Sequence, residues 1–164
     1  MKEFKFTNSK NVVVGGTFDH FHEGHKLLLT TAFYHAGFYG KLHVGITAQS
    51  MLADKLFLEQ IDPFEVRRAN VQGFLTRLKT YYKTEIEIEE LNDPYGRAIT
   101  DESLDAIVVT EEPGVKANVD EINRRRKKPL EVIICPTVFG EDGKRISSTR
   151  IRGREITNGG FTVQ

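Results

Sequence analysis

The stretch that decides the fold runs from Gly15 to His25 and reads GGTFDHFHEGH. It follows the short apolar run Asn11–Val14 and leads into residues 23–36, where apolar side chains recur at helical spacing. Two consecutive glycines allow a tight backbone turn that presents N–H groups. The stretch therefore predicts a buried strand, a turn, and a helix whose positive end faces that turn, which is an arrangement suited to binding an anion.

The rest of the chain continues this alternation. Apolar runs predict strands at 42–46, 85–91, 105–110 and 130–135. Helix signals predict a helix from a capping Asp62 to about Tyr82, a second over 115–127, and a short one from Ser147–Ser148. Strands joined by helix-length crossovers imply an α/β fold, namely one Rossmann-like, doubly wound domain over residues 1–164. We expect a five-stranded parallel sheet with helices on both faces and a ligand at the carboxyl ends of its strands.

Composition excludes several classes of protein. The 23 basic residues balance 23 acidic ones, so the overall field does not hold the chain to nucleic acid or to anionic lipid. A single cysteine excludes an internal disulfide framework, and Cys135, at the end of an apolar run, is expected in the core. No run of 18 apolar residues occurs, and Met1–Thr7 has no signal-peptide character. We expect a cytoplasmic protein without membrane or nucleic-acid partners, as a monomer or a small homo-oligomer.

Three histidines, His20, His22 and His25, fall within six positions. His22 and His25 are three residues apart and share one face at the helix start, while Gly24 between them leaves room for a phosphate. Imidazoles placed in this way can donate hydrogen bonds to oxygens that gain charge in a transition state. Zinc is the alternative reading because His-x-His-x-x-His offers three ligands, although the spacing is not that of the zinc proteases. We expect no metal ion held by the protein.

A second stretch, Ile146–Arg152, reads ISSTRIR. The hydroxyls of Ser147, Ser148 and Thr149 at a helix start can cap the helix and bind phosphate oxygens, and Arg150 can add charge-assisted bonds. Such a helix start is ordinary when it occurs alone. Together with the histidine stretch it indicates a nucleotide-phosphate site.

These motifs, Gly16–Asp19, His22-x-Gly-His25 and the ISSTR stretch 146–150, resemble the nucleotidyltransferases of the HxGH superfamily. Further motifs narrow the resemblance to the phosphopantetheine adenylyltransferases of archaeal and eukaryotic type, over nearly the whole chain; these motifs lie at 93–96, 108–112, 121–124 and 141–143. The loop 110–114 departs from the bacterial form, which carries an arginine there. Arg124 is the candidate replacement for that arginine.

The resemblance implies transfer of AMP from ATP to 4′-phosphopantetheine by in-line attack, giving dephospho-coenzyme A and pyrophosphate. It also implies that His25 donates to the α-phosphate and His22 to the ATP phosphates, while Thr17 orients the acceptor phosphate or the α-phosphate. Lys55 would lie between the two phosphate groups, and Mg²⁺ would arrive on the ATP phosphates. The other expected ATP contacts are the backbone of Gly16 and Phe18, the side chains of Ser147, Ser148 and Thr149, and the guanidinium groups of Arg150 and Arg124.

Three alternatives stay open at this point. The acceptor could be FMN, nicotinamide mononucleotide or glycerol 3-phosphate, although Arg145–Arg150 (RISSTR) differs from the Arg-Thr-x-Gly-Ile-Ser typical of cytidylyltransferases. The chain could also be a nucleotide sensor without turnover. Finally, the basic run 124–128 could bind RNA, but no aromatic side chains are interleaved with it, and apart from Arg124 we expect it on the solvated surface.

Overall fold

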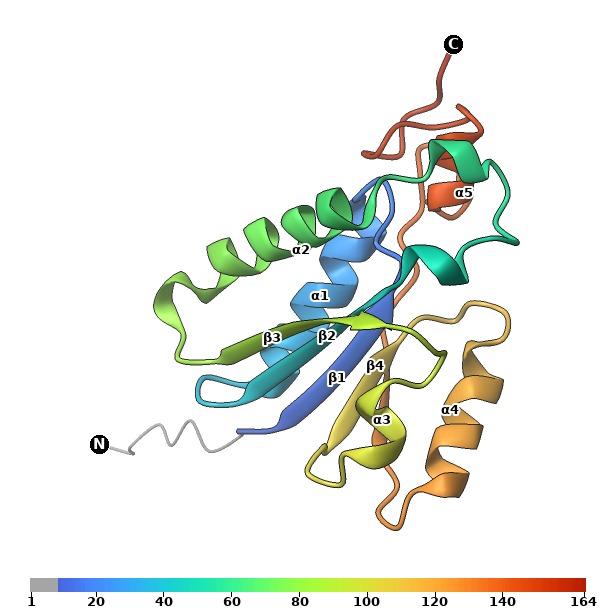
Figure 1. The fold of residues 1–164 in the computed structure, drawn as a ribbon. Coiled ribbons are helices and arrows are strands. Elements are labelled where there is room, and N and C mark those ends of the chain that lie inside the picture. Colours follow the sequence, from blue (N-terminus) through green and yellow to red (C-terminus); the bar gives the residue numbers. More distant parts are fainter. Residues whose placement is uncertain (1–8) are drawn as a thin grey trace.

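The computed structural model describes residues 9–164, so the N-terminal segment considered above and the first eight residues of the expected domain lie outside the described residues. Strands and helices alternate along the chain (Figure 1). The strands are β1 (Asn11–Gly16), β2 (Lys41–Thr47), β3 (Glu85–Leu91), β4 (Ala106–Val109) and β5 (Glu131–Ile134). The helices are α1 (Glu23–Ala36), α2 (Phe64–Leu78), α3 (Arg97–Thr100), α4 (Val115–Arg125) and α5 (Ser148–Arg152).

The five strands form one parallel sheet in the order β3-β2-β1-β4-β5. The chain moves outward from β1 to β3 and then returns to place β4 on the other side of β1. This reversal of strand order creates a crevice at the carboxyl ends of β1 and β4, which is the usual ligand position in such sheets. The predicted doubly wound α/β fold is confirmed.

Helices cover both faces of the sheet, with α1 and α2 on one side and α3 and α4 on the other (Figure 1). Alternation along β1 explains how one strand serves both layers. Val12 and Val14 belong to the larger core that includes α1 and α2, whereas Val13 belongs to the smaller core with Val119 and Ile122 of α4. Cys135 is buried in the larger core, as predicted. Within residues 9–164, no helix combines the length and apolarity needed to cross a bilayer.

The prediction that Asp62 caps α2 is wrong. Pro63 occupies the capping position and makes no side-chain cap. The Asp62 carboxylate instead accepts the backbone N–H of His20 at 3.2 Å. The helix is α-helical to Leu78 and ends in a tighter turn over Lys79–Tyr81, close to the predicted end.

The prediction that the basic run 124–128 is solvated beyond Arg124 is wrong at Arg126. This side chain is buried, and its guanidinium donates to four backbone carbonyls, those of Ala98, Asp101, Leu104 and Lys128. Arg126 thereby connects the end of α4 to the single turn of α3 and the segment before β4. The sequence pattern did not reveal the burial of Arg126, because it did not predict α3 or the backbone carbonyls near α3 that accept from this side chain.

Candidate active site

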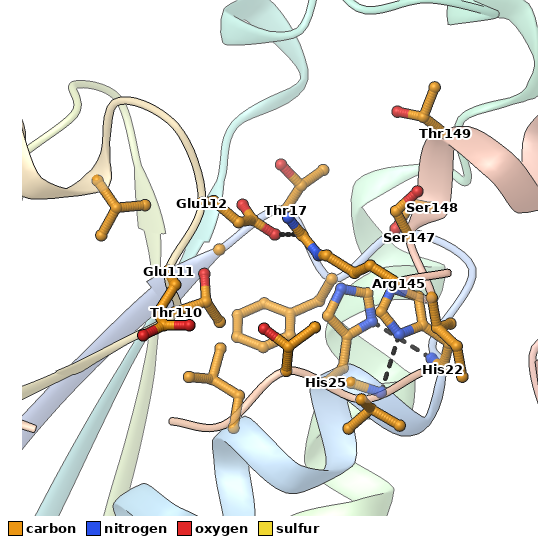
Figure 2. Close-up of a pocket in the computed structure, with 18 of the residues that line it drawn as sticks. Thr17, His22, His25, Thr110, Glu111, Glu112, Arg145, Ser147, Ser148 and Thr149 are labelled. Atoms are coloured by element: carbon orange, nitrogen blue, oxygen red, sulfur yellow. Dashed lines mark hydrogen bonds and ion pairs between the residues drawn. The ribbon is translucent and has the colours of Figure 1, made fainter. Parts of the chain in front are cut away.

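A cavity of about 470 Å³ opens where the strand order reverses, at the carboxyl ends of β1 and β4. Its wall comes from five parts of the chain that are far apart in sequence (Figure 2). These parts are the loop after β1 with the start of α1, the segment after β2, the loop after β4, the segment after β5, and residues 145–149 with Arg152. The position matches the ligand site expected from the strand pattern.

The two histidines at the start of α1 are oriented by backbone contacts. Nδ1 of His22 accepts the N–H of Gly24 at 3.1 Å, and Nδ1 of His25 accepts the N–H of His22 at 3.3 Å. Their rings stack with centroids 3.7 Å apart. Because Nδ1 is an acceptor in both rings, the neutral form of each carries its proton on Nε2. Each ring therefore presents an Nε2–H donor.

The same two histidines are neutral at physiological pH. Burial, helped by the positive charge of Arg145, lowers the pKa of His22 to about 4. Burial, together with His22 and Arg145, holds the pKa of His25 well below its ordinary value. The pair therefore supplies hydrogen-bond donors without full positive charges, which suits oxygens whose charge grows during a reaction.

The loop after β1 brings three of the other predicted residues to the cavity, namely Gly16, Thr17 and Phe18. Phe18 is fully buried in a left-handed backbone conformation (φ 54°), and its ring lies 5.3 Å from that of His25. A non-glycine residue with positive φ is uncommon and marks a backbone held by its surroundings. Lys55, from the segment after β2, also lines the cavity.

The three predicted hydroxyls lie together at the start of α5 and line the same cavity. Ser147 caps the helix by accepting the N–H of Arg150 at 3.3 Å. Ser148 donates its hydroxyl to the carbonyl of Asp19 at 2.7 Å, and Thr149 accepts from Arg152 at 3.3 Å. The bond from Ser148 ties the late motif directly to the loop after β1.

Two predicted arginines do not reach the cavity. Arg124 is exposed and pairs with Glu121 one turn earlier on α4, at 2.8 Å. Arg150 pairs with Glu155 at 2.9 Å and also contacts Asp142. The arginines that do line the cavity are Arg145 and Arg152, to which sequence reasoning gave no role.

Arg152, which lines the cavity, forms a buried ion pair with Asp19, with Nη1 and Oδ2 2.6 Å apart. The other oxygen of Asp19 accepts the N–H of Asp62 at 2.8 Å. The pair connects α5, the loop after β1 and the segment before α2. Asp19 stood within the recognised first motif, but only the fold reveals its partner.

Arg67 is a second hidden cation, fully buried on the inner face of α2. It donates to the carbonyls of Thr17 and Thr47, both at 2.8 Å, and so holds the ends of β1 and β2 together. Sequence reasoning missed this residue, although a signal existed. Arg67 stands four residues before Val71 on the apolar stripe of α2, where a charge needs buried partners.

The zinc reading of the three histidines does not fit this geometry. Nδ1 of both His22 and His25 is engaged by backbone N–H groups, while Nε2 of His20 lies 2.7 Å from the carbonyl of Gln60. Among the described residues, the one group of possible metal ligands is Asp19, His20 and Asp62. Each carboxylate oxygen of Asp19 already accepts one hydrogen bond, from the Asp62 N–H and from Arg152.

Comparison with known proteins agrees with this geometry. Residues 13–154 match the cytidylyltransferase-like family. The phosphopantetheine adenylyltransferase of Methanothermobacter thermautotrophicus is 38% identical over 155 residues, covering 93% of this chain and 89% of that protein. The protein of the same name from Pyrococcus horikoshii is 39% identical over 159 residues, covering 93% and 90%.

A solved structure also resembles this fold. It is that of an Archaeoglobus fulgidus protein described as having unknown function, with a TM-score of 0.61 and 28% identity, covering 76% of this chain and 97% of that one. The family match over residues 13–154 includes both the histidine stretch and the ISSTR stretch, and the named relatives cover nearly the whole chain. The chain therefore belongs to the cytidylyltransferase-like family and, within it, to the phosphopantetheine adenylyltransferases.

Proposed function

We propose that this chain transfers AMP from ATP to 4′-phosphopantetheine, giving dephospho-coenzyme A and pyrophosphate, as a step of coenzyme A synthesis. The observation that carries the proposal is the stacked pair His22 and His25, which lines the cavity with two neutral Nε2–H donors. It is supported by membership of a family whose curated relatives carry the adenylyltransferase name.

The reaction needs no activated nucleophile. An oxygen of the acceptor phosphate, already negatively charged, attacks the α-phosphorus of ATP and forms the new P–O bond. The bond from the α-phosphorus to the bridging oxygen breaks, and pyrophosphate leaves with the electron pair. Catalysis then rests on holding two anions in line and on stabilising the charge that spreads over the α-phosphate oxygens.

The lining residues can share these tasks. His25 donates to the α-phosphate and His22 to the neighbouring ATP phosphates, as the family resemblance implies. Thr17 and Lys55 also line the cavity; Thr17 orients the acceptor phosphate or the α-phosphate, and Lys55 lies between the two phosphate groups. The remaining contacts to ATP come from the backbone of Gly16 and Phe18 and from the hydroxyls of Ser147, Ser148 and Thr149. For Arg124 or Arg150 to reach ATP, each must first leave its carboxylate partner.

Magnesium enters this proposal with ATP, held by phosphate oxygens and water, because these are ligands it prefers. Among the described residues, the one group of three possible metal ligands, Asp19, His20 and Asp62, is not part of the cavity lining, which fits an ion held by the substrate. Bound in this way, the ion neutralises part of the triphosphate charge. Cytoplasmic location, oligomeric state and the lack of a nucleic-acid partner stay predictions from composition.

The test is pyrophosphate release with ATP and Mg²⁺, comparing 4′-phosphopantetheine, nicotinamide mononucleotide and FMN as acceptors, with CTP and glycerol 3-phosphate alongside. Release with ATP and 4′-phosphopantetheine alone is the expected result. Release with a different pair would keep the chemistry and replace the acceptor. ATP binding without release in any pair would favour a nucleotide sensor. In the active pair, His25→Ala should lower kcat about 10²-fold or more, with a smaller effect on ATP affinity.

A further inference from the structure

An ion pair crosses the mouth of the cavity. Glu112 comes from the loop after β4 and Arg145 from the segment before α5, and Figure 2 shows the two side chains meeting between Thr17 and the histidines. Both residues line the cavity, and their side chains are 43% and 39% exposed. The contact therefore connects two walls of the cavity at a place that solvent reaches.

The backbone of Arg145 is fixed. Its carbonyl accepts Nη1 of Arg150 at 2.7 Å, and the next residue, Ile146, donates its N–H to the carbonyl of Val138 at 3.0 Å. The guanidinium is held differently, because its ion-pair partner is a carboxylate on an exposed loop. An arginine with a fixed backbone and a guanidinium that can exchange partners is suited to binding a ligand.

The charge of Arg145 acts where the reacting phosphates are expected. It contributes to the low pKa values of both His22 and His25, so it stands close to the two imidazole donors. A carboxylate and a phosphate present oxygens in similar geometry to a guanidinium, which can bind either one through two parallel bonds. Glu112 contacts the guanidinium at Nη2, a position that a phosphate oxygen can also take.

The energetics favour exchange. An ion pair between partly exposed side chains changes an equilibrium constant by at most about 5-fold. A hydrogen bond to a charged group changes it by about 10- to 100-fold, and a triphosphate can offer several acceptor oxygens to one guanidinium. Leaving Glu112 beside bound polyphosphate would also place like charges together.

We propose that Arg145 is a phosphate-binding residue of the ATP site, and that Glu112 holds its guanidinium in the free protein and releases it when ATP binds. The proposal rests on the function proposed above, since it assumes an ATP site in this cavity. Glu112 then disfavours binding of ATP while keeping Arg145 oriented.

The test is the dissociation constant of ATP with Mg²⁺, measured by calorimetry for wild type, Glu112→Gln and Arg145→Gln. We expect Glu112→Gln to tighten ATP binding by up to about 5-fold, the equivalent of an exposed ion pair. Arg145→Gln should weaken it by about 10- to 100-fold. The opposite signs are decisive, because loss of a merely structural pair would shift both affinities in the same direction.

A second ion pair provides the matched control. Lys10 and Glu131 are 2.8 Å apart with exposed fractions of 34% and 54%, and neither lines the cavity. Lys10→Gln and Glu131→Gln should leave ATP affinity unchanged. If the wild type binds ATP and turns over but Arg145→Gln binds ATP no more weakly, this inference fails while the proposed function stands. Absence of ATP binding in wild type would overturn the proposed function as well.

Discussion

Replacing Gly24 with alanine offers a sharp test of the histidine geometry. Gly24 is the second residue of α1, and its N–H donates to His22 Nδ1 at 3.1 Å. A Cβ added at this position would lie 2.9 Å from Cε1 and 3.1 Å from Nδ1 of His22, whereas ordinary contacts begin near 3.4 Å. The ring must therefore move by about half an ångström or more. Because His22 stacks on His25, this shift changes the contact between the two rings.

The expected cost falls on turnover. A misplacement of about 1 Å at a catalytic group can cost about 10²-fold in rate, so we expect Gly24→Ala to lower kcat for pyrophosphate release by roughly 10- to 100-fold. The folded state should be nearly unaffected. Alanine is favoured over glycine in a helix by up to about 1 kcal/mol, and this offsets a hydrogen bond worth about the same.

Gly73→Ala provides the matched control within α2. Its added Cβ meets only the tip of Arg77, at 3.8 Å, so nothing needs to move. This variant should gain about 0.5–1 kcal/mol in urea unfolding with unchanged turnover. If Gly24→Ala turned over within about twofold of wild type, the position of the His22 ring would not limit catalysis and the reasoning would fail.

Three further predictions use other contacts. The contribution of His22 to the free energy of unfolding should fall by roughly 3 kcal/mol as pH drops from above 6.5 to 4, because burial lowers its pKa to about 4 and the unfolded chain takes up the proton first; well above pH 6.5 this contribution is constant. Urea titrations should show that loss and its reduction in His22→Asn. Arg126→Ala should cost about 3 kcal/mol by removing the donor to four backbone carbonyls, of which those of Ala98 and Leu104 are buried, with turnover of the folded protein unchanged. Arg124→Ala should leave the calorimetric dissociation constant of ATP within about twofold, since its guanidinium faces Glu121; a larger loss would support the role implied by the resemblance.

Most of the fold could be predicted because its signals are local. The apolar runs placed the five strands within a few residues of where they occur. The helix signals did the same for the starts of α1, α2, α4 and α5. The two exceptions have identifiable physical causes. Arg97–Thr100 forms a single turn, which is too short to leave a periodic pattern. Asp62 had the sequence signature of a cap, but its carboxylate bonds instead to a loop 42 residues away.

The candidate site divides in the same way. Residues within the two contiguous motifs could be found because their spacing alone puts them on one turn or one helix start. Sequence reasoning missed Arg67 and Arg145, since the partner of each is distant in sequence, although the place of Arg67 on the apolar stripe of α2 was a signal. Arg67 bonds to Thr17 across 50 positions, and Arg145 meets Glu112 from a different strand loop. A contiguous motif identifies side chains that face a ligand, but it does not identify their interaction partners that are distant in sequence.

Arg67, Arg145 and Arg152 lie near the cavity, and the burial of their partners indicates which of them support the fold and which can bind a ligand. Arg67 donates to main-chain carbonyls, and Arg152 pairs with Asp19, whose side chain is fully buried. Replacing either set of partners with a ligand would strand buried polar groups, which costs more than a new bond returns. Arg145 pairs with Glu112, whose carboxylate returns to water when released. Of these three cations, Arg145 is therefore the one that an incoming phosphate can take from its partner.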